Sequence, residues 1–274
     1  MEGGAMRGLF TAGVIDVMME NNLVYDGFVG VSAGSCFGCN YKSHQIGRVL
    51  RYNKKYCKKL ASFKSFITTG DFYDVEFAYH KLPWELDIFD NETFANDPSE
   101  FYSVSTDNAT GKPVYTKLEN GDVKDVEWIR ASASIPVLSK DVVIDGGYYS
   151  DGGTADSVPL RFMESIGYDR NVVILTQPKG YRKKPDKRVW MYKLTLKRWP
   201  KLIEALTNRY KMYNDELDYI DAAGEKGDIF AIYPKEALNI GAASHDPNEL
   251  QRVYDLGREV ALEKLEELKI FLEK

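Results

Sequence analysis

The sequence has 274 residues, 44% of them hydrophobic, which is enough to bury a large core in one domain. Charged residues interrupt every apolar run, so no segment reaches the roughly 20 apolar residues that cross a bilayer. The formal net charge of -5 and the lack of a recognised binding motif argue against a nucleic-acid partner.

The first twenty residues and the cysteines indicate the compartment. Charged side chains are scattered through residues 1–20, where a secretory signal peptide has a basic start followed by an apolar block. Cys36, Cys39 and Cys57 are an odd number and give no disulfide framework, which suits a reducing environment. We therefore expect a cytoplasmic protein.

Short apolar strands alternate with helical patterns along the chain. In chain order these patterns predict a helix at 8–21, a strand at 28–31, a helix at 33–41, strands at 100–106 and 113–118, a strand at 142–144, a helix at 159–167, a strand at 172–175, and helices at 199–223 and 247–273. Because helices are interleaved with buried strands, we expect an α/β fold, a three-layer α/β/α sandwich with a mostly parallel central sheet. No linker divides the sequence, so residues 1–274 are predicted to form a single domain.

The pentapeptide Gly30-Val31-Ser32-Ala33-Gly34 lies between a predicted strand and a predicted helix. In that context a G-x-S-x-G turn exposes its serine as a nucleophile. The turn is so sharp that side chains two positions before and after the serine would collide, which explains Gly30 and Gly34. The helix that follows favours negative charge developing beside Ser32. An ordinary serine in a tight turn is the alternative.

A nucleophilic serine needs a base, and the chain offers three histidines: His44, His80 and His245. The first lies at the far end of the helix after the serine, and polar sequence surrounds the other two, so we expect all three on the surface. Asp145 and Asp151 compete for the role, because each precedes two glycines that let the backbone fold back. The chain after Asp145 continues into the second arm of a predicted hairpin.

Three further segments accompany the serine pentapeptide: EGGAMRG at 2–8, ASASIP at 131–136 and DGGTADSVP at 151–159. In this order and spacing the four segments resemble the patatin-like phospholipases of the bacterial type. The resemblance reaches from residue 2 to about 160, and residues 161–274 resemble the C-terminal part of the same bacterial proteins. It implies a patatin-like fold and a catalytic dyad of Ser32 and Asp151 without histidine.

The resemblance also implies roles for the N-terminal loop. Gly3, Gly4 and Ala5 would form an oxyanion hole through backbone N–H groups, each of which typically stabilises a tetrahedral intermediate by about 3 kcal/mol. Arg7 would anchor this loop or contact a phosphate. We expect no cofactor and no metal.

Two departures from the family pattern concern this loop. The family usually has Gly-Gly-Gly-x-Arg-Gly, whereas Ala5 stands at the third glycine, where a positive φ would cost roughly 1 kcal/mol. The family also has a buried strand ahead of the loop, and this sequence begins almost inside it. We expect either that this strand is missing or that the protein starts upstream.

Two other patterns bear on ligands. Cys36 and Cys39 form a C-x-x-C without a second pair, so core packing is expected rather than a metal site. Twelve basic residues face two acidic ones between Lys179 and Lys211, with aromatic residues among them. Such a segment suits peripheral contact with an anionic membrane, and packed apolar residues with solvated lysines are the alternative.

Together these patterns predict a cytoplasmic serine esterase of lipid metabolism and lipid degradation. It would be a phospholipase A, a lysophospholipase or an acyl esterase, acting on phospholipid or another acyl-ester substrate. Two alternatives stay open: a non-catalytic lipid-binding protein on the same fold, suggested by Ala5 and the absent strand, and an acyltransferase that passes the acyl group to an alcohol.

Overall fold

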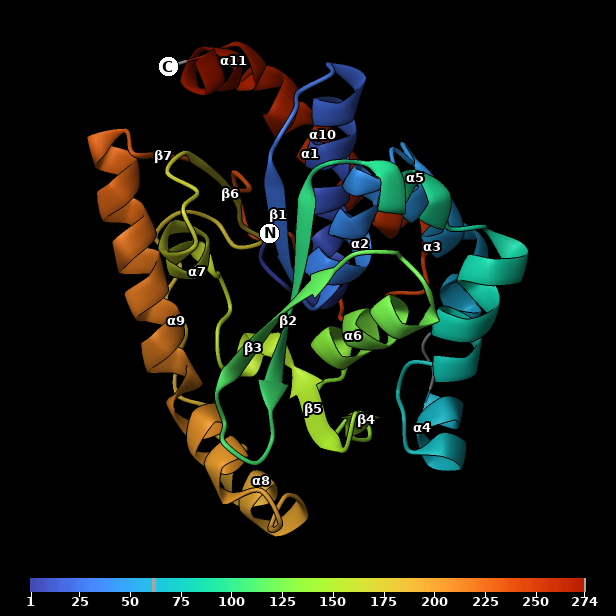
Figure 1. Ribbon diagram of the computed structural model, residues 1–274. Helices are drawn as coiled ribbons and strands as arrows, with labels where there is room; N and C mark the ends of the chain where they lie inside the picture. The colour runs from blue at the N-terminus through green and yellow to red at the C-terminus, as the bar shows by residue number, and fades with distance from the viewer. Residues whose placement is uncertain (61–62, 274) are drawn as a thin grey trace.

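The computed structural model describes residues 1–60 and 63–273. Strands lie in the middle of the molecule, with α9 along one flank and α2, α3 and α6 along the other (Figure 1). The strands are β1 (Gly27–Val31), β2 (Glu100–Asp107), β3 (Pro113–Leu118), β4 (Val142–Ile144), β5 (Gly147–Asp151), β6 (Asn171–Ile174) and β7 (Ile229–Ile232).

The helices cover this sheet region on both flanks. The α-helices are α1 (Gly8–Glu20), α2 (Ala33–Lys42), α3 (Arg48–Leu60), α4 (Phe63–Thr69), α5 (Asn91–Asn96), α6 (Val123–Ala133), α7 (Leu160–Ser165), α8 (Val189–Thr195), α9 (Pro200–Lys226), α10 (Pro247–Glu263) and α11 (Leu265–Glu273). A π-helix, η2 (Glu76–Leu86), and two short 3-10 helices, η1 (Ala5–Arg7) and η3 (Gly152–Thr154), complete the set. The single helix expected at 247–273 is divided at Lys264.

Strand β2 organises the main sheet because it is paired along both edges. Antiparallel β3 occupies one edge, beside residues 101–106. On the other edge β1 runs parallel beside residues 100–104, and β5 runs antiparallel beside residues 105–107. β1 and β5 therefore approach each other end to end along the same edge, and their carboxyl ends meet there.

The α/β class with a central sheet surrounded by helices is confirmed, but the sheet is mixed rather than mostly parallel. β1 pairs with β2 and β6 pairs with β7 in parallel, whereas β2–β3, β2–β5 and β4–β5 are antiparallel. Strands joined by short turns must pair antiparallel. The β4–β5 turn has Asp145 and Gly146 at φ 49° and 81°, as a two-residue hairpin requires.

The first two residues join the main sheet to the separate β6–β7 pair. The Met1 amino group donates to the Val29 carbonyl at 2.9 Å, and Val31 N–H donates to the Met1 carbonyl at 3.2 Å. Glu2 N–H donates to the Ile174 carbonyl at 3.0 Å on the other side. The loop that follows is thereby held between two strand edges.

Helix α1 lies at the centre of the largest described apolar cluster, and each residue from Gly8 to Met19 is buried. It crosses α10 at very short range. A Cβ added to Gly257 would lie 2.0 Å from the Phe10 carbonyl oxygen, and one on Gly13 would lie 2.1 Å from that of Tyr254. The C-terminal helices therefore pack directly on the helix that follows the N-terminal loop. No helix among the described residues is long and apolar enough to cross a membrane.

Candidate active site

The serine turn has the strain expected of an exposed nucleophile. Ser32 follows β1, begins α2, and has φ 54° and ψ -121°, a conformation that L residues rarely adopt. A Cβ on Gly30 would lie 2.4 Å from the Gly34 carbonyl oxygen, and one on Gly34 would lie 2.4 Å from that of Met1. Both glycines are thus needed for close backbone approach, as the pentapeptide predicts.

Asp151 reaches the serine because of strand register. Val31 pairs with Val104 and Asp151 pairs with Ser105, so β1 and β5 end at adjacent positions along the same edge of β2. The Ser32 hydroxyl lies near enough to the Asp151 carboxylate for hydrogen bonding between them to lower the pKa of that carboxyl. Gly153 N–H donates to the same carboxylate at 2.8 Å. The structure thus places side by side the two residues that the family resemblance implies as a dyad.

Burial dominates the electrostatics of Asp151, which is 7% exposed. Loss of hydration raises the pKa of its carboxyl, and the positive charge of Arg209 and the hydrogen bonds from Ser32 and Gly153 oppose that rise. Arg209 comes from α9 and its Nε donates to the Gly153 carbonyl. Arg209 lies fifty-six residues after Gly153 in the sequence, so no local pattern indicates that it belongs to the site.

The segment 131–136, at the end of α6, contacts both Ser32 and Asp151. Ser32 N–H donates to the Ser132 hydroxyl oxygen at 2.8 Å, across one hundred residues of sequence. Asp151 N–H donates to the Ser134 carbonyl at 2.8 Å. The sequence marks these serines only as part of a motif, and the contacts give them a positioning role.

A buried carboxyl pair fixes α9 against the turn after Asp151. The Glu216 carboxyl accepts hydrogen bonds from the N–H groups of Ser157 at 3.2 Å and Val158 at 3.1 Å. Burial and the neighbouring Asp156 raise the pKa of Glu216 to about 10, so it is protonated at neutral pH and can donate to Asp156. The contact ties α9, which also carries Arg209, to the turn after Asp151.

The N-terminal loop lies against the serine. A Cβ on Gly3 would lie 2.8 Å from the Ser32 Cβ. The backbone N–H groups of Gly4 and Ala5 have no acceptor among the described residues, so they are available to an oxyanion. Ala5 has φ 50°, so this position does require the left-handed conformation. Alanine adopts that conformation at a higher energy than the glycine usual in the family.

Arg7 ends the short helix η1 and precedes α1, and it pairs with no acid among the described residues. Its N–H donates to the Gly4 carbonyl at 3.1 Å. Its buried Nε has no hydrogen-bond partner, and it makes no ion pair with the described residues. The guanidinium lies close to the loop, since a Cβ on Gly4 would be 3.2 Å from Arg7 Nη2.

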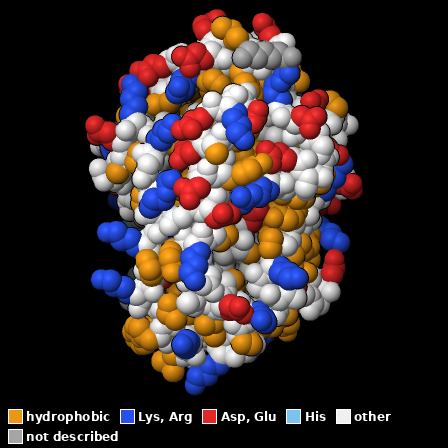
Figure 2. Space-filling view, turned by 90° about the vertical axis from the view of Figure 1, so that its left-hand side faces the viewer, with side chains coloured by type: hydrophobic (Ala, Val, Ile, Leu, Met, Phe, Trp, Pro, Cys, Tyr) orange, Lys and Arg blue, Asp and Glu red, His pale blue; other side chains and the backbone are white. Residues whose placement is uncertain are grey.

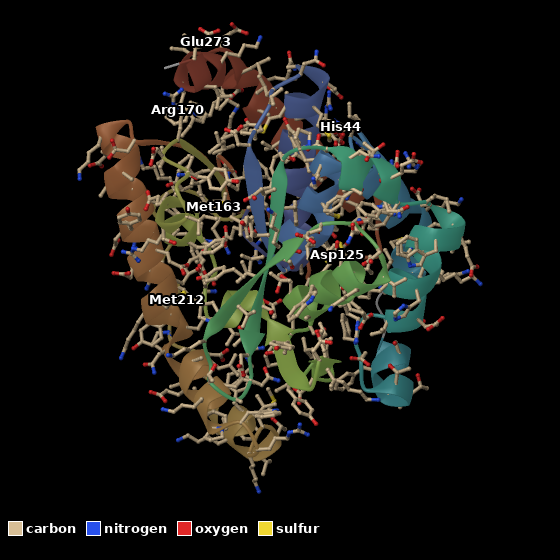
Figure 3. All side chains as sticks on the ribbon, in the orientation of Figure 1. His44, Asp125, Met163, Arg170, Met212 and Glu273 are labelled. Carbon is tan, nitrogen blue, oxygen red and sulfur yellow. The ribbon has the colours of Figure 1, made fainter. Side chains whose placement is uncertain are left out.

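The other candidate bases for Ser32, the three histidines and Asp145, lie elsewhere. His44 is paired with Asp97 at 2.8 Å, near the end of α2 away from Ser32, and Figure 3 shows it beside α5. His80 is 3.4 Å from Glu127, and His245 is exposed. Asp145 stands in the β4–β5 turn with a side chain that is 75% exposed.

Cys36 and Cys39 are free thiols that line an apolar cavity, and the described residues hold no cluster suited to a metal. The cavity has a volume of about 120 Å³ and opens beside Ser32. Its walls come mainly from α2, α3, η2, α6 and the residues just before η2 and after α6, and they include Phe37, Leu60, Tyr73, Leu82, Ile129 and Ile135. Ligand sites for apolar groups typically have such a lining of hydrophobic and aromatic side chains.

Comparison with known proteins identifies a family and several relatives of this chain. Residues 1–163 match the family described as patatin-like phospholipase, and residues 199–273 match a domain of unknown function, DUF6363. The uncharacterized protein YjjU of Escherichia coli (strain K12) is 29% identical over 94% of this chain and 73% of its own length. VipD from Legionella pneumophila has a TM-score of 0.46 at 13% identity, covering 97% of this chain and 66% of that one.

Two larger relatives have named activities. The lysophospholipases NTE1 of Pyricularia oryzae and nte1 of Aspergillus fumigatus are each 25% identical to this chain. The match covers 61% of this chain but only 11% of each lysophospholipase. The family match, in contrast, covers more than half of this chain and contains both the serine turn and the turn at Asp151. The protein belongs to the patatin-like phospholipase family.

Proposed function

We propose that the protein is a lipid acyl hydrolase in which Ser32 attacks an ester carbonyl and Asp151 accepts the serine proton. The observation that carries the proposal is the placement of the Ser32 hydroxyl beside the buried Asp151 carboxylate, where β1 and β5 end at adjacent positions of β2 and an apolar cavity opens. Family membership and the two lysophospholipase relatives support a lipid ester as the substrate.

The reaction proceeds in two halves. Ser32 Oγ bonds to the carbonyl carbon as its proton passes to Asp151, and the N–H groups of Gly4 and Ala5 hold the oxyanion. The intermediate collapses to an acyl-serine, and the leaving alcohol takes the proton from Asp151. Water then attacks the acyl-serine and gives its proton to the same aspartate. Release of the fatty acid returns the proton to Ser32.

Hydrolysis of a lipid panel tests this proposal. Monoacylglycerol and lysophospholipids of one acyl chain are incubated with wild type, Ser32→Ala and Asp151→Asn, and fatty acid release is measured. Each variant should lose at least about a thousandfold in rate, because nucleophile and base act as a unit. Matching thermal unfolding shows that the variants are folded. Undiminished turnover by Asp151→Asn would remove this residue from the role, and inactivity of the wild type would favour a non-catalytic lipid-binding protein.

Hydrolysis and acyl transfer share the acyl-serine, so they differ only in the acceptor. The same assay with an added alcohol and analysis of the acyl products separates them. A hydrolase releases mainly fatty acid when the alcohol is dilute, whereas an acyltransferase forms mainly the new ester.

We also propose that the α8 end of the molecule contacts an anionic membrane. Figure 2 shows basic and hydrophobic side chains together, with few acidic ones, on the lower part of the α9 face. On α8, Trp190 is 68% exposed and Leu194 is 59% exposed, and Lys193 beside them is also exposed. Exposed aromatic and basic side chains favour the interface of anionic lipids.

Vesicle sedimentation tests this contact. Wild type should sediment with vesicles that contain phosphatidylglycerol and much less with phosphatidylcholine vesicles, because only the former supply negative charge. Trp190→Ala should weaken binding, whereas Ile270→Ala, at an equally exposed site on α11, should not. Equal sedimentation with both vesicle types would discard the proposal.

A further inference from the structure

The apolar cavity beside Ser32 is bounded by matching faces of two helices. Along α2 and along α6 runs a row of lining residues spaced four and then three positions apart, and such positions share one face of an α-helix. The two rows are Ser32, Cys36 and Cys39 at α2, and Ala133, Ile129 and Val126 on α6. Each helix therefore presents one continuous stripe to the cavity.

Both rows begin at the nucleophile. Ser32 stands immediately before α2, and its N–H donates to the hydroxyl oxygen of Ser132, next to Ala133 at the end of α6. From there each row runs seven residues along its helix, which corresponds to about 10 Å along the axis. The cavity therefore reaches about two helical turns away from Ser32.

A buried arginine closes the far end of these rows. Arg48, the first residue of α3, lines the cavity and is 5% exposed. Its Nη1 donates to the side-chain oxygen of Asn40 at 3.0 Å. Asn40 follows Cys39, the last member of the α2 row, so the guanidinium stands where the apolar wall ends.

The guanidinium of Arg48 is fixed on several sides. Its Nε and Nη2 donate to the Asp87 carbonyl at 3.2 and 2.6 Å, and its Nε is 3.3 Å from the Asp87 carboxylate. The centres of the Tyr52 and Phe89 rings lie 5.3 and 5.4 Å from its central carbon. Charge-assisted hydrogen bonds are stronger than neutral ones, so an alkyl chain that reaches Arg48 cannot push it aside without a loss of these bonds.

The dimensions of the cavity indicate how much of an acyl chain it can hold. Carbons bonded about 1.5 Å apart advance about 1.25 Å each in an extended chain, so about 10 Å accommodates about eight of them. An apolar cavity of about 150 Å³ binds benzene, which has six carbons. The cavity beside Ser32 has a volume of about 120 Å³. Both measures correspond to an acyl group of about five to eight carbons.

The geometry points to an acyl subsite that ends at Arg48 and selects acyl chains of about five to eight carbons over chains of sixteen. This inference rests on the proposed hydrolase function, because the subsite holds the acyl group that Ser32 accepts. The first methylenes are buried between the two rows, whereas carbons beyond about eight meet a guanidinium that is already hydrogen-bonded. Figure 1 shows α2, α3 and α6 together on this flank of the sheet.

A series of p-nitrophenyl esters tests the subsite. The acyl chains have four to sixteen carbons, and each ester is kept below the concentration at which it aggregates. kcat/KM should rise about fourfold for each added CH₂, because each buries one more methylene, and should stop rising at about eight carbons. A rise that continues to sixteen carbons would overturn the inference.

Truncation at the closed end tests where the subsite stops. Leu82 lines the cavity, and its carbonyl accepts from Asp87 N–H at 2.9 Å, beside Arg48. Leu82→Ala removes three carbons there, so the longest well-accepted chain should lengthen by about two or three carbons. Leu268→Ala is the same truncation at a similarly buried position on α11 and should leave the profile unchanged. An unchanged profile in Leu82→Ala, or an equal shift in Leu268→Ala, would contradict the subsite.

Replacement of the arginine tests the stop itself. In Arg48→Leu the Asp87 carboxylate keeps its two hydrogen bonds from Arg51, each 2.8 Å. The kcat/KM ratio of the twelve-carbon to the eight-carbon ester should rise at least about tenfold. Arg51→Leu removes the other arginine of this carboxylate, which does not line the cavity, and should leave the ratio unchanged. A folded Arg48→Leu with the wild-type ratio would remove Arg48 from the role, and if this variant does not fold, Leu82→Ala decides.

A binding measurement keeps this test separate from the test of catalysis. Methyl ketones of the same chain lengths have no ester to cleave, and Ser32→Ala cannot add to their carbonyl. By calorimetry with Ser32→Ala, affinity should rise about fourfold per CH₂ up to about eight carbons and then level off. Affinity that climbs steadily to sixteen carbons would contradict the subsite even if the wild type is active. If the wild type hydrolyses no ester but affinity still levels off, the proposed function fails and the subsite stands.

Discussion

At the residue scale, Asp151 combines burial with the task of accepting a proton. A buried carboxyl is a stronger base than an exposed one, since its pKa is raised, but it must be ionised to act. The positive charge of Arg209 opposes this rise and favours the ionised carboxylate. Sequence reasoning identifies the aspartate but not the cation that tunes it.

The acid limb of the pH–rate profile should depend on the opposing effects of burial and of Arg209 on the pKa of Asp151. kcat/KM should fall as pH drops through the raised pKa of Asp151, because the protonated carboxyl cannot accept the serine proton. Arg209→Gln removes a charge that lowers this pKa, so the acid limb should move to higher pH, measured with a neutral monoacylglycerol. Arg161→Gln, which removes an exposed arginine paired with Asp215, is the control and should not move it. A limb that stays in place in Arg209→Gln would refute the coupling.

At the element scale, the site depends on how β1, β5 and α9 meet. The serine turn and the glycine-rich turn at Asp151 are short local patterns, which is why the sequence indicates both. β1 and β5 share one edge of β2 because of the register in which they pair with it. The hydrophobic periodicity of the sequence does not reveal that register. Two of the antiparallel pairs that replace the expected parallel sheet, β2–β3 and β4–β5, are hairpins whose turns the sequence marks, whereas the β2–β5 pair joins strands far apart in the sequence. The sequence assigns no role to Arg209, Ser132 or Ser134. These residues lie on α9 or at the end of α6, and their contacts are with residues far away along the chain.

Glu216 links α9 to the turn after Asp151. Its titration should make the free energy of unfolding depend on pH. The folded-state pKa of about 10 lies above the ordinary 4.5, so stability from this group is complete below the ordinary value and declines as pH rises toward 10. Glu216→Gln cannot ionise, so the melting temperature should fall less between about pH 5 and pH 9 than in wild type. Glu225→Gln on the exposed end of α9 is the control. Parallel curves for wild type and Glu216→Gln would show that the pair does not govern this dependence.

At the scale of the whole molecule, the two family matches correspond to parts that share one core. α1 lies in the patatin-like part and α10 in the C-terminal part, and they cross with backbone in contact. We propose on this basis that residues 1–274 form one domain, so the chain should unfold in a single cooperative transition.

Substitution at the α1–α10 crossing tests that proposal. Gly257→Ala places a Cβ 2.0 Å from the Phe10 carbonyl oxygen, so it should lower the free energy of unfolding by about 1–3 kcal/mol. Gly224→Ala, in the last turn of α9 with no atom within 4 Å of the added Cβ, should leave stability unchanged or slightly higher. Denaturant unfolding that shows two transitions, with only one affected by Gly257→Ala, would contradict a single domain.

The central claim is that Ser32 is a nucleophile activated by Asp151. Its most direct measurement is labelling with a fluorophosphonate, followed by mass spectrometry of the modified peptide. The account predicts one phosphonylated residue, Ser32, in wild type, and labelling slowed at least about a hundredfold in Asp151→Asn, because the proton acceptor is gone. Modification of another serine, or wild-type labelling of Ser32 in Asp151→Asn, would contradict it.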